Sequence, residues 1–339
     1  MKINMISETM GKNGPIDANG VHSAFMDVLN SLRKLPDIEV EVNGEGDDYD
    51  VIHSHTIGPV FMKKSKGKRY KTLVSAHVIP ESMVGSIILS KYWLPFFTMW
   101  MKRAYNRASM VLAVSPTVKK RLEELNIKAK VVFMPNSINR ENFQYSTDKS
   151  YRSKYNLSPT DFVVLCIGQI QTRKGVADFI ECAHMMPDVK FIWAGNRPFG
   201  KATAGFTETE KMIEEAPENC KFIGKVDRDD MPKVLNMSDV FFFPSFQENH
   251  PVAVIEAASA KLPIILRDIE EYKDIFFDYY LKGKTNIEFV EIIKKLKTDK
   301  ELYSEYMEKA DKIGEEYDVI TVTKKLVNAY KEVYQNYKK

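Results

Sequence analysis

The chain has 339 residues, of which 44% are hydrophobic and 28% charged, and its net charge is +3. This composition is typical of a soluble globular protein, and the length suits two domains of about 150 residues each. No run of roughly 18 or more uncharged apolar residues occurs, so we expect no membrane-spanning helix. Glu8 interrupts the segment in which a signal peptide needs an apolar core, and three cysteines without metal-type spacing predict reduced thiols in a cytoplasmic protein.

Short apolar runs that alternate with helical patterns predict two successive sets of parallel strands. The first set is Lys2–Ile6, Val51–His53, Thr72–Ser75, Val111–Val114 and Val131–Met134. The second set is Phe162–Ile167, Lys190–Trp193, Lys221–Ile223, Val240–Phe243 and Pro263–Leu266. Near-continuously apolar strands of this kind have helices on both faces, so the predicted fold class is α/β, with two doubly wound domains.

A polar stretch, Arg140–Thr160, separates the two sets of strands. We therefore expect one Rossmann-like domain in residues 1–145 and a second in residues 158–318. The charged segment Glu301–Lys339 has apolar residues at helical spacing and predicts terminal helices. Ligands of such sheets bind at the carboxyl ends of the strands, so the cleft between two facing domains is the expected site.

The first candidate motif is the loop Ala18–His22, between the first strand and the helix after it. Gly20 and the free backbone amides beside it could approach a phosphate closely. The same residues are equally compatible with a simple turn.

A second motif, Asp50–Thr56, places His53 and His55 on the same side at the end of a strand. Two imidazoles could bind a metal, but the other histidines show no zinc-type spacing, so we expect His55 to hydrogen bond a substrate hydroxyl or phosphate instead. A histidine satisfied within the core is the alternative.

The region Val51–Lys130 holds 15 Lys and Arg against 3 Asp and Glu, which predicts an anionic partner. Within it, Gly85–Ala108 contains two of the three tryptophans, Trp93 and Trp100. After Pro95, one face of the predicted helix is apolar and the other carries basic residues. The apolar face comprises Phe96, Phe97, Trp100, Met101, Ala104, Tyr105 and Ala108. The basic residues are Lys102, Arg103 and Arg107. Such a helix, with the cluster Lys63–Arg69 upstream, favours an anionic membrane surface. The alternatives are an ordinary core-packed helix and a nucleic-acid interface, and no groove-reading motif accompanies the charge.

The third motif, Gly168–Gly175, follows a strand and precedes a helix that begins near Val176. Arg173 and Lys174 place two positive charges beside a helix amino terminus, where anions are favoured. The motif is neither a Walker loop nor a dinucleotide fingerprint, so by itself it indicates only a possible diphosphate site.

The strongest motif runs from Pro244 to Ala257 and places two carboxylates, Glu248 and Glu256, eight residues apart. Glu248 lies in the expected loop and Glu256 inside the helix that follows Pro251. Carboxylates accept hydrogen bonds from vicinal hydroxyls, which suits sugars and ribose. Glu256 is surrounded by apolar residues and therefore needs a partner if it is buried. The alternative is that both are ordinary charges near a helix start.

These residues resemble the retaining family-4 glycosyltransferases, which have the GT-B fold, because Glu248 and Glu256 match the Glu-x7-Glu motif of that family. The resemblance covers nearly the whole chain and includes the Gly20 loop, Asp50–His55, Val114–Pro116, Met134–Asn136, Gly168–Gly175, Ala194–Gly195 and Ser238–Pro244. More narrowly, the chain resembles the bacterial diglycosyl-diacylglycerol synthases, through Ala76–Ser82, Gly168–Gly175, Leu266–Asp268 and Tyr272–Asp274.

The resemblance implies a role for each matching residue. Arg173 and Lys174 would hold the donor diphosphate, Glu256 the ribose hydroxyls and Glu248 the hexose. His55 would lie beside the donor sugar and the acceptor, and Gly20 would line the phosphates.

Three sets of site residues are expected. The catalytic set is His55, Arg173, Lys174 and Glu248. The further donor-binding set is Gly20, Gly168, Asn249, His250 and Glu256. The membrane and acceptor set is His77, Trp93, Trp100, Lys102, Arg103 and Arg107. No metal or cofactor is expected, and the final helix, residues 319–339, would pack back on the first domain.

The implied reaction transfers glucose or galactose from a UDP-sugar, with retention, to monoglucosyl-diacylglycerol at the inner face of the plasma membrane. Another acceptor stays open, either diacylglycerol itself or a polysaccharide or teichoic-acid precursor, and so does a non-catalytic accessory protein. Nucleic acid is not an expected partner. The sequence departs from the family pattern in two places: Lys261 stands where a glycine is usual, and Asp268–Asp274 replaces a Gly-Gly loop.

Overall fold

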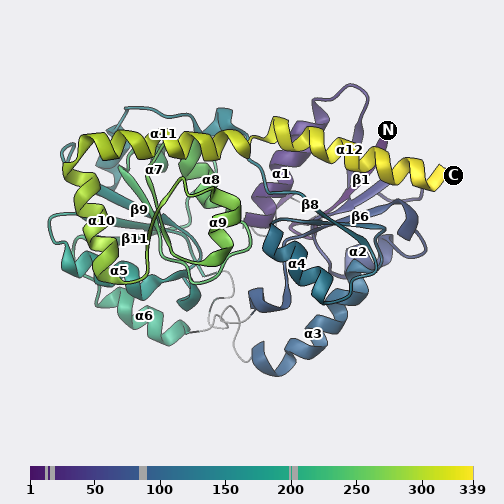
Figure 1. Cartoon of the computed structure of the whole chain (residues 1–339), viewed down its shortest axis with the longest axis horizontal. Coiled ribbons are helices and arrows are strands. Elements are labelled where there is room, and N and C mark those ends of the chain that lie inside the picture. Colours follow the sequence, from purple (N-terminus) through teal and green to yellow (C-terminus); the bar gives the residue numbers. More distant parts are fainter. Residues whose placement is uncertain (12–13, 16–19, 84–89, 198–199, 201–204, 339) are drawn as a thin grey trace.

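The computed structural model contains two six-stranded parallel sheets side by side (Figure 1). It describes residues 1–11, 14–15, 20–83, 90–197, 200 and 205–338. The first sheet has the order β4-β1-β5-β6-β7-β8, with β1 Lys2–Ile6, β4 Glu39–Val42, β5 Val51–Ser54, β6 Thr72–Ala76, β7 Met110–Ala113 and β8 Lys130–Phe133. The second has the order β11-β10-β9-β12-β13-β14, with β9 Val163–Ile167, β10 Lys190–Ala194, β11 Cys220–Gly224, β12 Val240–Phe243, β13 Ile264–Arg267 and β14 Leu281–Gly283. β2 Met10–Gly11 and β3 Gly14–Pro15 pair as a small antiparallel sheet.

Helices flank both sheets (Figure 1). In the first half they are α1 Gly20–Arg33, α2 Pro59–Lys64, α3 Ser90–Tyr105 and α4 Pro116–Glu124. In the second half they are α5 Val176–Met185, α6 Phe206–Glu214, α7 Met231–Asn236, α8 Val252–Ser259, α9 Glu270–Phe276, α10 Asn286–Thr298 and α11 Lys300–Glu316, and α12 Val319–Lys338 ends the chain. The short 3₁₀ turns are η1 Arg69–Lys71, η2 Pro80–Met83, η3 Arg140–Phe143, η4 Ser150–Tyr155 and η5 Thr172–Lys174.

The predicted fold class is confirmed, because the apolar runs form parallel strands buried between layers of helices. All ten predicted strands are present, with ends that move by at most one residue. The prediction of about five strands per sheet was wrong by one in each case. The strands that were missed, β4 and β14, lie at sheet edges. β4 reads Glu-Val-Glu-Val and is only half-buried, and β14 has three residues, so neither carries the apolar run that marks a central strand.

The last helix, α12, returns from the second half to the first (yellow in Figure 1). Val322, Leu326, Tyr330 and Val333 are buried in the same core as Ile3 of β1. The Tyr330 hydroxyl also lies 2.7 Å from Nδ1 of His53 at the end of β5. Helix α12 therefore packs against the strands of the first sheet and contacts the end of β5.

The structure divides the apolar residues predicted for one face of α3 between two faces. Met101, Ala104 and Tyr105 are buried in the core of the first half, and Ala108 beyond the helix is buried with them. Phe96 and Trp100 lie instead on an exposed face. Residues 84–89, at the start of the predicted segment, lie outside the described residues. The prediction of a single apolar face was therefore wrong. At 100° per residue the apolar side chains spread over a broad stripe of the helix, and the core buries only one side of that stripe.

The two departures from the family pattern have local structural solutions. Lys261 has φ +56°, in the left-handed region that favours glycine, and its Nζ lies 2.8 Å from Oδ2 of Asp311 in α11. Within the segment Asp268–Asp274, which replaces the glycine loop, α9 begins at Glu270. Of the helices that the structure describes, none is long and apolar enough to span a membrane.

Candidate active site

A cavity of about 760 Å³ lies between the two halves, at the carboxyl ends of their strands. The second sheet supplies the loops after β9 and β12, two neighbouring strands whose connections lead to opposite sides of the sheet. A ligand site at such a switch point is the rule for doubly wound sheets. The wall includes residues from both halves, among them Gly20, His22, Met26, His77 and Asn136 from the first and Gly168, Gln169, Lys174, Arg228, Glu248 and Glu256 from the second.

Gly175 allows the loops after β9 and β12 to touch. Its φ is +78°, and a Cβ atom added there would lie 2.5 Å from the carbonyl oxygen of Pro244. The close approach also lets the backbone NH of Phe246 donate to the carbonyl of Arg173, at 2.9 Å. The turn that carries Arg173 and Lys174 is therefore fixed against the loop that carries Glu248.

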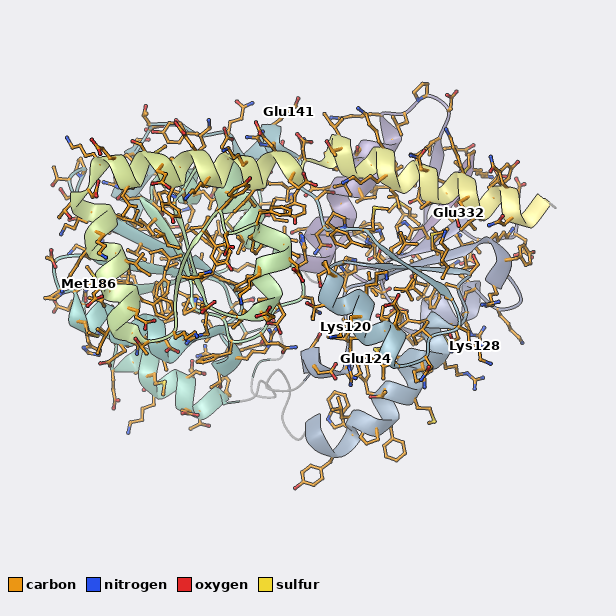
Figure 2. The ribbon with its side chains drawn as sticks, in the orientation of Figure 1. Lys120, Glu124, Lys128, Glu141, Met186 and Glu332 are labelled. Atoms are coloured by element: carbon orange, nitrogen blue, oxygen red, sulfur yellow. The ribbon has the colours of Figure 1, made fainter. Side chains whose placement is uncertain are left out.

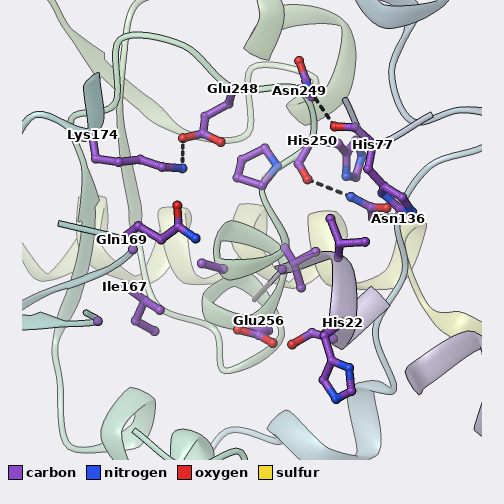
Figure 3. A pocket seen from close by; sticks show the side chains of 18 of the residues that line it. His22, His77, Asn136, Ile167, Gln169, Lys174, Glu248, Asn249, His250 and Glu256 are labelled. Carbon is purple, nitrogen blue, oxygen red and sulfur yellow. Dashed lines mark hydrogen bonds and ion pairs between the residues drawn. The ribbon is translucent and has the colours of Figure 1, made fainter. Parts of the chain in front are cut away.

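Glu248 accepts hydrogen bonds from two donors on one of its carboxylate oxygens, and a second cation lies near that oxygen. Lys174 Nζ donates to Oε1, Ser245 Oγ donates to the same oxygen at 2.7 Å, and Arg173 Nη1 lies 3.8 Å away. Arg173 also donates to the carbonyl of Gln247 at 3.1 Å. Figure 3 shows the Lys174–Glu248 contact at the edge of the cavity. Glu248, Lys174 and Arg173 thus form a group of one anion and two cations that is largely removed from water.

The charges in this group alter one another's pKa. Burial raises the pKa of the Glu248 carboxyl, but Lys174 and Arg173 outweigh burial and leave it below the usual value. Burial lowers the pKa of the Lys174 ammonium, and Glu248 opposes that effect. Paired in this way, Glu248 stays an anion and Lys174 is the cation beside it.

Glu256, the second carboxylate, projects from α8 into the other end of the cavity (Figure 3). The partner that its burial requires is Arg228, whose Nη1 lies 3.9 Å from Oε1. Burial raises the pKa of Glu256 to about 7; Arg228 lowers the value, and Asp27 of α1 raises it further. Arg228 was not singled out in the sequence, because it follows β11 without any motif of its own.

Side-chain amides join the two halves around the loop that bears Glu248. Asn249 Nδ2 donates to the carbonyl of His77 at 2.9 Å and to Ser82 Oγ at 2.8 Å. Asn136 Nδ2 donates to the carbonyl of His250 at 2.9 Å. The loop is therefore in contact with the first half on two sides (Figure 3).

His55 lies behind the cavity wall. It is absent from the lining of the large cavity and lines a smaller space of about 20 Å³ together with His53 and His77. Its Nδ1 lies 3.3 Å from Nε2 of His77, which lines both spaces. Burial lowers the pKa of His53 to about 3 and that of His77 to about 4, and it lowers the pKa of His55 well below the usual value, so all three rings are neutral.

The structure brings together most of the residues predicted for the site. Those that line the large cavity are Gly20, Gly168, Arg173, Lys174, Glu248, Asn249, His250, Glu256 and His77. The α3 residues of the membrane and acceptor set lie outside this lining. Gly20 begins α1, whereas Ala18 and Asn19 of the same predicted loop lie outside the described residues. Among the described residues, no group of three or more His, Cys, Asp and Glu could hold a metal ion.

Comparison with known proteins gives this geometry its context. Residues 147–313 match the family model for glycosyl transferases group 1, and residues 12–142 match that for glycosyltransferase family 4. The alpha-galactosylglucosyldiacylglycerol synthase of Streptococcus pneumoniae is 30% identical over 94% of this chain and 86% of its own length. The processive diacylglycerol alpha-glucosyltransferase of Acholeplasma laidlawii is also 30% identical, over 98% of both chains.

Solved structures agree with the fold. The Anabaena protein HepE in complex with UDP-glucose superposes with a TM-score of 0.77 at 16% identity, covering 98% of this chain and 100% of that one. The sucrose-phosphate synthase of Thermosynechococcus elongatus gives 0.80 at 15% identity, covering 98% and 99%. The expected GT-B fold is thereby confirmed. The chain belongs to the family-4 glycosyltransferases, and bacterial diacylglycerol glycolipid synthases are among its relatives.

Proposed function

We propose that the protein is a retaining hexosyltransferase that moves glucose or galactose from a UDP-sugar to monoglucosyl-diacylglycerol and so makes a dihexosyl-diacylglycerol. The observation that carries the proposal is the cavity, whose wall includes the cations Arg173 and Lys174 and the carboxylates Glu248 and Glu256. The chain is also similar over nearly its whole length to diacylglycerol glycosyltransferases. A diphosphate needs cations, and a hexose and a ribose need hydrogen-bond acceptors, so the wall matches the three parts of a UDP-hexose.

In this proposal Arg173 and Lys174 hold the donor diphosphate and stabilise the negative charge that develops as it leaves. The acceptor hydroxyl forms the new bond to the anomeric carbon on the face that the diphosphate leaves, and its proton passes to the departing phosphate oxygen. Glu248, whose Oε1 is already bound by Lys174 and Ser245, offers its other oxygen to the hexose. Glu256 accepts hydrogen bonds from the ribose. His55 acts on the site by positioning the ring of His77, whose Nε2 lies 3.3 Å from Nδ1 of His55.

The acceptor decides between the proposed function and its main alternative. One relative is named a processive diacylglycerol alpha-glucosyltransferase, which favours diacylglycerol itself as a second candidate acceptor. The test incubates the enzyme with UDP-glucose or UDP-galactose and either diacylglycerol or monoglucosyl-diacylglycerol. Mass and linkage analysis of the product then gives the donor, the acceptor and the anomeric configuration. Product from neither lipid with either donor would contradict the proposal.

We expect transfer to proceed without a divalent metal, because Arg173 and Lys174 supply positive charge at the leaving diphosphate. Treatment with EDTA should therefore change the turnover number by less than about twofold, since chelation leaves both side chains in place. The measurement is the initial rate at saturating UDP-sugar before and after chelation. Loss of activity that Mg²⁺ or Mn²⁺ restores would refute this expectation.

We further propose that the exposed face of α3 docks on the cytoplasmic side of the plasma membrane. Tyr92, Phe96 and Met99 are 80%, 70% and 66% exposed, and Trp100 is exposed beside them. At 100° per residue these side chains share one face with Arg103. Figure 2 shows the side chains of this helix extending from the rest of the molecule. Apolar side chains next to a cation are what an anionic bilayer binds.

The charge around α3 is smaller than its sequence indicates. Lys64 pairs with Glu45 at 3.0 Å and Lys68 pairs with Asp47, so two cations of the upstream cluster are compensated. Arg107 donates to the carbonyl of Met62 at 3.3 Å. The apolar residues therefore carry more of the proposed membrane affinity than the basic ones do.

The double variant Phe96→Ser/Met99→Ser should bind phosphatidylglycerol vesicles at least about tenfold more weakly, because each side chain contributes about 1.5–3 kcal/mol when an apolar phase buries it. Cosedimentation over a range of lipid concentrations measures the effect. Ile287→Ser is the matched control, since Ile287 is 61% exposed on α10 in the other half. Equal binding by the double variant and the wild type would eliminate α3 as the docking face.

A further inference from the structure

One arginine joins two buried carboxylates that come from different halves of the molecule. Arg228 Nη2 lies 2.6 Å from Oδ1 and 2.7 Å from Oδ2 of Asp27 in α1. Its Nη1 lies 3.9 Å from Oε1 of Glu256 in α8. Asp27 and Glu256 are 4% and 6% exposed, so neither carboxylate has much water to replace a lost partner.

The guanidinium is held unequally between the two carboxylates. Both oxygens of Asp27 are within hydrogen-bond distance of Arg228, whereas the nearest oxygen of Glu256 is not. The guanidinium carbon also lies 5.8 Å from the ring centre of Phe143, which limits its position from another direction. Asp27 therefore holds Arg228 in place.

The unequal arrangement matters because Glu256 and Arg228 both line the cavity, while Asp27 does not. A guanidinium released from Asp27 would turn to the remaining anion and form a direct ion pair with Glu256. Such a pair would occupy the carboxylate oxygens that a ligand diol needs as acceptors. The arrangement in the structure keeps those oxygens directed at the cavity.

We propose that Asp27 is a positioning residue for nucleotide binding: it restrains Arg228, so that Glu256 stays available to the two hydroxyls of a ribose. The proposal rests on the proposed function, in which Glu256 binds the ribose of a nucleoside diphosphate. It gives the first half of the chain a part in donor recognition, although Asp27 itself touches no substrate. The two residues of the ion pair are 201 positions apart, so the site forms only when both halves are assembled.

The test compares the dissociation constants of UDP and of its 2′,3′-dideoxy analogue, measured by calorimetry. In the wild type, loss of the two hydroxyls should weaken binding about tenfold or more, because hydrogen bonds to a charged group are among the strong ones. Asp27→Asn should reduce this ratio to near one. Asp27→Asn/Arg228→Gln should regain part of it, because no guanidinium then competes for Glu256.

Controls separate this effect from damage to the fold. Asp311→Asn removes a half-buried carboxylate that pairs with Arg140 and Lys261 outside the cavity lining, and it should leave the ratio unchanged. If Asp27→Asn does not fold, the double variant carries the test, because it leaves no buried charge of the pair unmatched. A wild-type ratio in Asp27→Asn overturns the proposal, and so does a double variant no better than the single one. A wild-type ratio in Glu256→Gln would instead overturn the ribose assignment on which the proposal rests.

Discussion

Replacing Lys174 by alanine should lower the turnover number about 10² to 10³-fold, the usual effect of removing one charge-stabilising donor from an active site. The ammonium lies at the cavity wall beside Glu248, where the diphosphate is expected to bind. Its loss removes a cation that the leaving group needs and also leaves Glu248 with Ser245 and the more distant Arg173 as partners. Initial rates over a range of UDP-sugar concentrations should show the fall mainly in kcat.

Two further variants make this result specific. Lys149→Ala removes a half-buried lysine that pairs with Asp239 at 3.3 Å in the same half of the chain, outside the cavity lining. It should leave kcat within about twofold of the wild type, because the ion pair with Asp239 and the hydrogen bond to the carbonyl of Ser238 that are lost both lie outside the site. Lys174→Arg keeps the charge and should recover part of the rate. A Lys174→Ala enzyme that folds and turns over normally would exclude Lys174 from diphosphate binding.

The sequence predicted the parts of this molecule that depend on neighbours in the chain. The central strands are apolar runs, so their burial in parallel sheets followed from composition, and the helix after Gly175 followed from the glycine and the strand before it. The loops that hold Glu248 and Lys174 could be located because ligand sites form at strand ends. The edge strand β4 could not, because half of its side chains face water.

Contacts between distant residues were beyond such reasoning. Lys174 and Glu248 are 74 positions apart, and no spacing rule predicts that one forms an ion pair with the other. His55 illustrates the same limit, because alternation along β5 gives the side of the strand but not the presence of His77 between His55 and the cavity. The division of α3 between core and surface likewise depends on how the helix is rotated against the core of the first half, which its own periodicity does not specify.

Glu256→Gln should stabilise the folded protein at alkaline pH and weaken its binding of UDP. Burial disfavours the charged form and raises the pKa of Glu256 in the folded protein from its ordinary value of 4.5 to about 7. Between these two values the folded protein holds a proton that the unfolded chain has released, so the stability of the wild type falls as the pH rises through that window. The loss amounts to about 3 kcal/mol above pH 7, and glutamine, which does not ionise, avoids it.

Chemical denaturation at pH 5 and pH 8 measures the first effect: the two proteins should differ little at pH 5, and the variant should be the more stable at pH 8. Asp27, whose pKa burial also raises, and Arg228 are present in both proteins, so the comparison isolates Glu256.

UDP titrations measure the second effect, the weaker binding of UDP. The affinity of the wild type for UDP should increase from about pH 6 to about pH 8, because Glu256 becomes the carboxylate that accepts hydrogen bonds from the ribose. The variant should lack this increase. A variant with the same pH profile as the wild type in both measurements would show that Glu256 is an ordinary buried side chain. The predicted opposition between the two measurements is the physical signature of a binding carboxylate, since the charge that destabilises the empty cavity is the one that the nucleotide requires.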